Sequence, residues 1–211
     1  MRSRDIISSR KIVSFFVATK RVARRINYPE RECIVTRFGF KEISPSNWLE
    51  PDDVLRGFVG ISFDGQVRPL VAEDYLNCIL RPNLHESIPE DVQGLFEVAR
   101  GAMAYGYFFY PLFTLAMEQL FRVAEAAVVN KCATLGVPTS LKTFDERINW
   151  LVEKSIIPQS ERESWEAVRH LRNMASHPER QSILPPSYAA GVLERIASQI
   201  NSLFNDKVAK D

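Results

Sequence analysis

Apolar residues recur at helical spacing through most of the chain from residue 89 onward. Local start and stop signals divide this part into five predicted helices, over about 89–105, 111–135, 143–155, 160–177 and 186–203. Proline or threonine stands at or near the start of each helix, and Gly136 and Pro178 end two of them. Short connections between consecutive helices are typical of a bundle with mostly antiparallel neighbours. We therefore predict a mainly α fold in which residues 89–211 form a four- or five-helix up-and-down bundle.

The chain before residue 89 has a different pattern. Residues 1–26 mix apolar and basic residues at spacings that predict an amphipathic helical arm, and Pro29 follows its end. Residues 27–88 hold short apolar runs separated by Gly, Pro, Asn and Asp, which predicts a small irregular α+β region of unknown role. Within it, the Asp64-Gly65 pair predicts a hairpin over 61–67, and residues 74–80 predict a short helix.

Charge is balanced overall and uneven along the chain. The 27 Lys and Arg residues exceed the 26 Asp and Glu residues by one. Residues 1–26 carry eight basic residues and one acidic residue, so this arm has a net charge of about +7 and the remainder about −6. Such an arm can contact nucleic acid, an anionic membrane or an acidic patch of its own chain.

Several functional classes lack support in the sequence. The three cysteines, Cys33, Cys78 and Cys132, are far apart and form no metal-ligand spacing, so we expect no metal and no cofactor. Glycine-rich nucleotide loops, zinc-protease motifs and nucleophile elbows do not occur. The uncharged stretch 101–117 is interrupted by Pro111 and runs directly into Glu118, which predicts a buried helix and no membrane span. We therefore expect a cytoplasmic protein.

Candidate chemistry gathers at the end of the fourth predicted helix. Arg169, Asn173 and His177 follow one another at four-residue intervals and share one helix face, and Arg172 lies beside Asn173. The helix dipole at this end favours the protonated form of His177. An arginine, an amide and a titratable histidine can together bind a phosphate and move a proton. A solvated helix end whose histidine only caps carbonyl groups has the same spacing.

The segment from about residue 89 to residue 206 resembles the HEPN domains (higher eukaryotes and prokaryotes nucleotide-binding). Their signature is an Arg followed after four to six residues by a His, near the end of a late helix in a helical bundle. Here it reads Arg172-Asn-Met-Ala-Ser-His177, with the polar residue after Arg that the family commonly carries. The second helix, with Glu118 in an apolar stretch, is also similar to an early core helix of the family.

The resemblance implies a metal-independent endoribonuclease of the toxin or phage-defence type. Two chains of a homodimer would each donate an Arg/His pair to one composite cleft, and RNA would be cleaved through attack by the ribose 2′-OH. Arg172 would stabilise charge on the phosphoryl oxygens, Asn173 would hold the histidine or a phosphate oxygen, and His177 would act as base or acid; Arg169 would contact RNA. The resemblance also implies a possible antitoxin or nucleotidyltransferase partner.

Two other functions remain open from the sequence. Many HEPN domains are catalytically silent, so this chain could be a module for dimerisation and for binding nucleic acid, nucleotide or protein. The basic arm over residues 1–26 could instead attach the protein to a membrane surface. Glu118, inside an apolar helix, would either pair with Arg172 or Arg169 or face solvent.

Overall fold

The computed structural model describes residues 16–17, 41–61, 66–175 and 186–205. Seven α-helices, one 3₁₀ helix and a small antiparallel sheet are formed within these ranges, so the prediction of a mainly α fold with a small α+β region is confirmed. The five helices from residue 90 onward are α3 (Glu90–Tyr105), α4 (Leu112–Thr134), α5 (Phe144–Glu153), α6 (Arg162–Ala175) and α7 (Pro186–Leu203). The 3₁₀ helix η1 (Gln159–Glu161) leads into α6.

Local sequence signals explain where the helices begin and end. The side chain of Thr143 accepts a hydrogen bond from the backbone of Glu146, whose own carboxylate accepts from the backbone of Thr143, so a capping box opens α5. Gly136 follows the end of α4 with φ of 70°, a left-handed conformation that glycine adopts without strain. These signals act within a few residues, which is why they can be read from the sequence.

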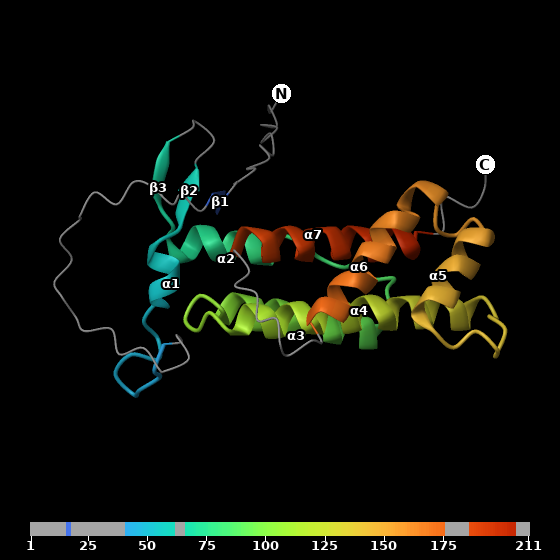
Figure 1. Ribbon diagram of the computed structural model, residues 1–211, viewed down its shortest axis with the longest axis horizontal. Coiled ribbons are helices and arrows are strands. Elements are labelled where there is room, and N and C mark those ends of the chain that lie inside the picture. Colours follow the sequence, from blue (N-terminus) through green and yellow to red (C-terminus); the bar gives the residue numbers. More distant parts are fainter. Residues whose placement is uncertain (1–15, 18–40, 62–65, 176–185, 206–211) are drawn as a thin grey trace, which may run out of the picture.

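The helices form two layers (Figure 1). α3 and α4 lie antiparallel in one layer, α2 (Ala72–Leu80) and α7 lie in the other, and α6 crosses α4 obliquely. α4 contacts α3, α5, α6 and α7. Its buried side chains run along the whole helix from Phe113 to Cys132. Phe113, Ala116 and Met117, at the end of the uncharged stretch, are therefore part of the bundle core, as the sequence predicts, whereas Tyr105 and Leu115 in the same stretch are exposed.

Gly106, at the end of α3, has no room for a side chain. A Cβ atom on Gly106 would lie 2.9 Å from the carbonyl oxygen of Met103 and 3.0 Å from the ring of Phe113. Its φ of −55° is ordinary for any residue, so the requirement for glycine here is one of space.

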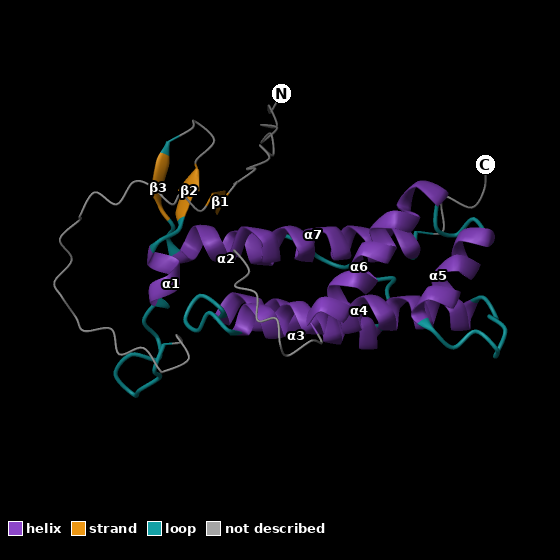
Figure 2. Cartoon of the chain, in the orientation of Figure 1, coloured by secondary structure: helices purple, strands orange, loops and turns teal. Residues whose placement is uncertain are grey.

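The sheet has the order β1-β2-β3, with antiparallel pairing throughout (Figure 2). β2 (Val59–Ile61) and β3 (Val67–Pro69) pair with Ile61 opposite Val67, which confirms the predicted hairpin; its turn, 62–65, lies outside the described residues. β1 (Phe16–Val17) pairs with β2, so the helical prediction for the arm is wrong at these two residues. An aromatic and a β-branched residue are well suited to pair with the open edge of β2. The rest of residues 1–26 lies outside the description.

The region before the bundle shares its core. Leu55 from α1 (Asp53–Arg56), and Tyr75 and Ile79 from α2, are buried in the same cluster as the side chains of α3 and α4. The hydroxyl of Tyr75 donates to the carbonyl oxygen of Met103 near the end of α3. The ring of Tyr75 also stacks on Tyr107, with centroids 5.6 Å apart.

Asp52 fastens this region to the α3–α4 connection. Its side chain is 2% exposed and accepts hydrogen bonds from the backbone nitrogens of Val54, at 3.1 Å, and Tyr110, at 2.8 Å. Its own backbone nitrogen donates to the carbonyl oxygen of Tyr107. Lys41 adds a second attachment, because its ammonium group donates to the carbonyl oxygens of Glu50 and Phe108.

Candidate functional site

α6 carries the residues for which the sequence predicts chemistry. Its first turn is fixed to α5, since the guanidinium group of Arg162 donates twice to the side-chain oxygen of Asn149, at 3.1 and 2.9 Å. Arg162 also forms an ion pair with Glu166, one turn along the helix, at 3.0 Å. Trp165 and Val168 are buried and pack in the bundle core. The first half of α6 is therefore held against α5 and the bundle core.

The last two turns of α6 contain three of the four predicted site residues. The helix backbone runs through Arg169, Arg172 and Asn173 and is described as far as Ala175, while the side chains of residues 169–175 lie outside the description. Arg169 and Asn173 are one helical turn apart, as the sequence predicts. His177 lies outside the described residues. The structure thus places the backbone that would carry these groups and leaves their mutual contacts as a prediction.

Glu118, the aromatic residues at the α3–α4 connection and His85 have ordinary surroundings. Glu118 is half-buried on α4 and makes no hydrogen bond or ion pair with the described residues. The aromatic residues 105–109 lie at the α3–α4 connection, where Tyr107 contacts Tyr75 and Phe108, whereas Tyr105 is 62% exposed. His85 is exposed, and its backbone nitrogen donates to the side chain of Asn201.

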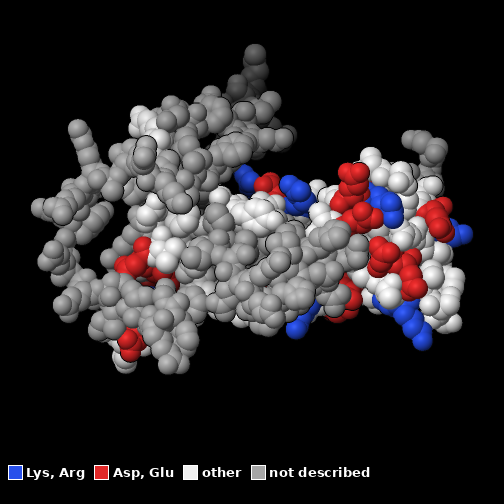
Figure 3. Space-filling view, viewed as in Figure 1, with Lys and Arg blue, Asp and Glu red and all other residues white. Residues whose placement is uncertain are grey.

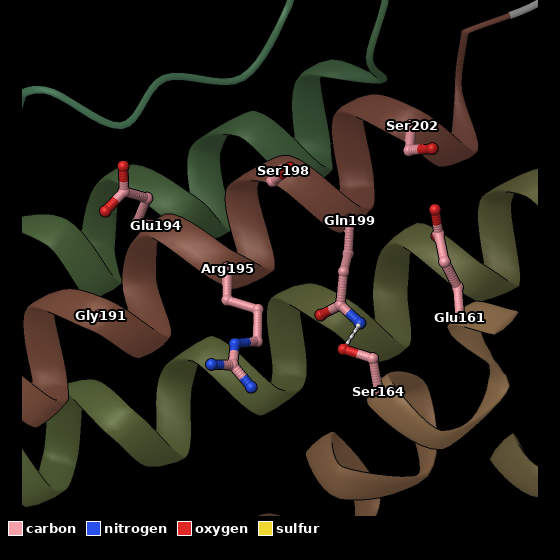
Figure 4. Close-up of a pocket in the computed structure, with 8 residues that line it drawn as sticks. All are labelled: Glu161, Ser164, Gly191, Glu194, Arg195, Ser198, Gln199 and Ser202. Atoms are coloured by element: carbon pink, nitrogen blue, oxygen red, sulfur yellow. Dashed lines mark hydrogen bonds between the residues drawn. The ribbon is translucent and has the colours of Figure 1, made fainter. Parts of the chain in front are cut away.

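A polar groove that the sequence analysis did not identify lies between the start of α6 and α7 (Figure 4). Its volume is about 590 Å³. The lining residues come from η1, α6 and α7: Glu161, Ser164, Gly191, Glu194, Arg195, Ser198, Gln199 and Ser202. Small and polar side chains along one side of α7 keep this space open beside α6.

Gln199 is the buried polar group of the groove. The residue is 7% exposed, and its side-chain nitrogen donates to the hydroxyl of Ser164 at 2.9 Å. Its side-chain oxygen is buried and has no hydrogen-bond partner in the described part of the chain. If the side-chain amide of Gln199 is flipped, its nitrogen is left without a partner, because Ser164 can pair with only one of the two amide atoms. An unpaired buried polar atom costs about 1–3 kcal/mol of stability.

Charges along the groove are balanced. Glu194 forms an exposed ion pair with Arg81 at 3.1 Å. Arg195 is exposed and makes no hydrogen bond or ion pair with the described residues. On the face shown in Figure 3, acidic and basic side chains alternate over the α5–α6 end of the molecule. No broad field of one sign is formed there by the described residues.

The sequence does contain a signal for Gln199. Val192, Ile196, Ile200 and Leu203 form the apolar stripe of α7, and Gln199 lies three residues after Ile196 and four before Leu203. A polar residue at core spacing indicates a buried hydrogen bond or a site. Arg195 and Ser164 carry no such signal, because polar residues on exposed helix faces are ordinary.

Burial perturbs several titratable groups away from this groove. Burial raises the pKa of Tyr110 to about 12, with a further contribution from the negative charge of Asp52. Burial also raises the pKa of the Cys132 thiol, although the charge of Arg147 opposes this. These groups stay protonated at neutral pH and are thus poor candidates for general bases.

The described residues contain neither a metal site nor a membrane-spanning helix. In those ranges, no three His, Cys, Asp or Glu side chains are grouped so that they could hold a metal ion. Nor does any helix there have both the length and the apolar character needed to span a lipid bilayer.

Comparisons with known proteins give one family match. Residues 102–205, just under half of the chain, are similar to a family described as a domain of unknown function, DUF4145. A search of curated proteins and a search of solved structures find no significant match. The matched segment begins near the end of α3 and ends just after α7, so this chain is similar to that family over the last turn of α3 and over α4, α5, α6 and α7.

Proposed function

We propose that the protein is a metal-independent, cytoplasmic endoribonuclease whose site is built around the end of α6. The observation that supports this is the position of α6. Arg169, Arg172 and Asn173 lie on its last two turns, and the helix is anchored in a bundle core by Trp165 and Val168. An anchored helix can hold catalytic groups in a fixed geometry.

The reaction needs two proton transfers and one charge to be stabilised. A histidine takes the proton from a ribose 2′-OH, the 2′-oxygen bonds to the adjacent phosphorus, and the bond from phosphorus to the 5′-oxygen breaks. A second histidine gives its proton to the departing 5′-oxygen. Arg172 stabilises the charge on the phosphoryl oxygens. The products are a 2′,3′-cyclic phosphate and a 5′-hydroxyl.

This proposal requires a homodimer. One chain has three histidines. His85 is exposed on the segment between α2 and α3, His170 lies on α6, and His177 follows α6 in the sequence. Two copies of His177, one from each chain, supply the base and the acid together. We propose that the ends of two α6 helices meet across the dimer axis.

The test is cleavage of RNA by the full chain in the presence of EDTA. We expect 2′,3′-cyclic phosphate ends from RNA and no cleavage of DNA of the same sequence, because DNA lacks the 2′-OH. His177→Ala and Arg172→Gln should each reduce the rate by at least about 100-fold. His85→Ala is the matched control and should keep full activity.

Absence of cleavage by a folded dimer would contradict the nuclease proposal and favour a catalytically silent module that binds nucleic acid, nucleotide or protein. The alternating charges over the α5–α6 end favour the protein-binding form of this alternative, because they attract a polyanion only weakly. Sedimentation of the full chain distinguishes monomer from dimer. A monomer contradicts the composite site whatever the activity measured.

A further inference from the structure

The groove between α6 and α7 has the construction of a binding site for a small polar molecule. Its volume of about 590 Å³ lies within the usual range for small-ligand sites. It is lined by Glu161 of η1, by Ser164 at the start of α6 and by α7, whereas Arg172 and Asn173 lie on the second half of α6. The groove is therefore a separate feature of the fold.

Gln199 provides a hydrogen-bond acceptor that no described residue pairs with. Its side-chain oxygen is buried, faces the groove and has no partner among the described residues (Figure 4). The hydrogen bond from its nitrogen to Ser164 holds the amide in this orientation. A hydrogen-bond donor placed beside this oxygen completes the pairing, and a ligand hydroxyl is such a donor.

Arg195 supplies a positive charge at the groove. It lies one helical turn before Gln199, and Figure 4 shows both side chains projecting from the same side of α7. Its guanidinium group has no partner in the described structure, so its donors are available to a ligand. A guanidinium group binds phosphate through two parallel hydrogen bonds.

The Ser164 hydroxyl completes the set of donors. It accepts from Gln199, so its own hydrogen remains available, whereas Figure 4 shows that the side chains of Ser198 and Ser202 do not point toward Arg195 and Gln199. A phosphate group, with three terminal oxygens, uses more of these donors than a carboxylate with two. Glu161 and Glu194 offset the charges of Arg195 and Arg81, so the groove as a whole suits one phosphate better than a run of them.

We propose that this groove binds a phosphate ester that carries a hydroxyl group next to the phosphate. Arg195 and the Ser164 hydroxyl bind the phosphate, and the side-chain oxygen of Gln199 accepts the hydrogen bond of the neighbouring hydroxyl. A small phosphorylated polyol has this chemistry, and so does the ribose 2′-OH beside a 3′-phosphate in RNA. The proposal does not depend on the nuclease activity.

The experiment titrates the isotopically labelled full chain and follows the backbone amide signals of residues 191–202 by NMR. Glycerol 3-phosphate is compared with 3-hydroxypropyl phosphate, which lacks the hydroxyl next to the phosphate, and a short RNA is compared with DNA of the same sequence. We expect glycerol 3-phosphate to bind at least about tenfold more tightly than its analogue. If RNA binds more tightly than DNA and the small phosphate esters do not bind, the ligand of the groove is an RNA strand, whose 2′-OH lies next to a phosphate.

Three variants assign the binding to these residues. Arg195→Gln removes the charge at an exposed position and should weaken binding at least about tenfold, whereas Arg122→Gln, at an exposed position on α4, should change nothing. Gln199→Met removes the acceptor and should abolish the preference for the hydroxyl-bearing ligand. The proposal is overturned if none of the ligands shifts these signals, or if Arg195→Gln and Arg122→Gln bind equally well. If no ligand shifts the signals, only water pairs with the side-chain oxygen of Gln199.

Discussion

Replacing the buried carboxylate of Asp52 tests how the N-terminal region is attached to the bundle. Asp52→Ala removes the acceptor for the backbone nitrogens of Val54 and Tyr110, at 3.1 and 2.8 Å. The first bond caps α1, and loss of an N-cap costs about 1 kcal/mol. The second leaves a buried N–H without a partner, which costs about 1–3 kcal/mol. We expect the free energy of unfolding to fall by about 2–4 kcal/mol.

The assay is urea unfolding of the full chain, followed by far-ultraviolet circular dichroism. The slope of the free energy with urea should stay unchanged, because the surface exposed on unfolding is the same. Asp52→Asn keeps one side-chain oxygen but places an NH₂ group against the other donor, so it should lose nearly as much stability. Asp91→Ala is the control: this exposed residue accepts one hydrogen bond, from Asn130 at 3.1 Å, and its loss should cost less than about 0.5 kcal/mol.

A loss below about 1 kcal/mol for Asp52→Ala, or a loss equal to that of Asp91→Ala, would refute this reasoning. It would mean that water replaces the carboxylate and that the α3–α4 connection is not held as the contacts indicate. The RNA and phosphate-ester assays of the same variant should be unaffected as long as it remains folded, since both candidate sites lie on α6 and α7.

Three further predictions concern single positions. Gly106→Ala should cost about 1–3 kcal/mol in urea unfolding because its Cβ would lie 2.9 Å from the Met103 carbonyl oxygen, whereas Gly94→Ala, with nothing within 4 Å, should stabilise by up to about 1 kcal/mol. Thr143→Ala should cost about 1 kcal/mol by the same measurement because it breaks the capping box. Tyr110 has a folded pKa of about 12 against an ordinary 10, so its contribution to stability is complete below pH 10 and is lost as the pH rises through 12. Tyr110→Phe should therefore lose less stability than the wild type between pH 9 and 12, and equal losses would contradict the assignment.

Features set by neighbouring residues were predictable from the sequence. The starts of α3 and α5 follow from Pro89 and from the Thr143 capping box, and the end of α4 from Gly136. The β2–β3 hairpin follows from the alternation around Asp64-Gly65. Each of these signals lies within a few residues of the feature that it specifies.

Features set by distant residues were not predictable. β1 depends on pairing between Phe16–Val17 and Val59–Gly60, and the residues around β1 read as a helical arm. Asp52 looks like an ordinary N-cap until Tyr110 is brought against it. The groove depends on how α6 and α7 diverge across α4, so Ser164 and Gln199 become partners only in the folded chain. The Arg172–His177 arrangement stays a prediction.

The burial of Tyr75 and Ile79 has a consequence for the segment that matches the family. That segment starts at residue 102, so it lacks α2 and all of α3 except the last turn, although both helices cover the hydrophobic core at this end. A polypeptide limited to the matched residues would leave Phe113 and its neighbours open to water. Any protein that shares only this segment must close the same end with an element of its own, and the pieces before residue 102 can then differ freely between such proteins.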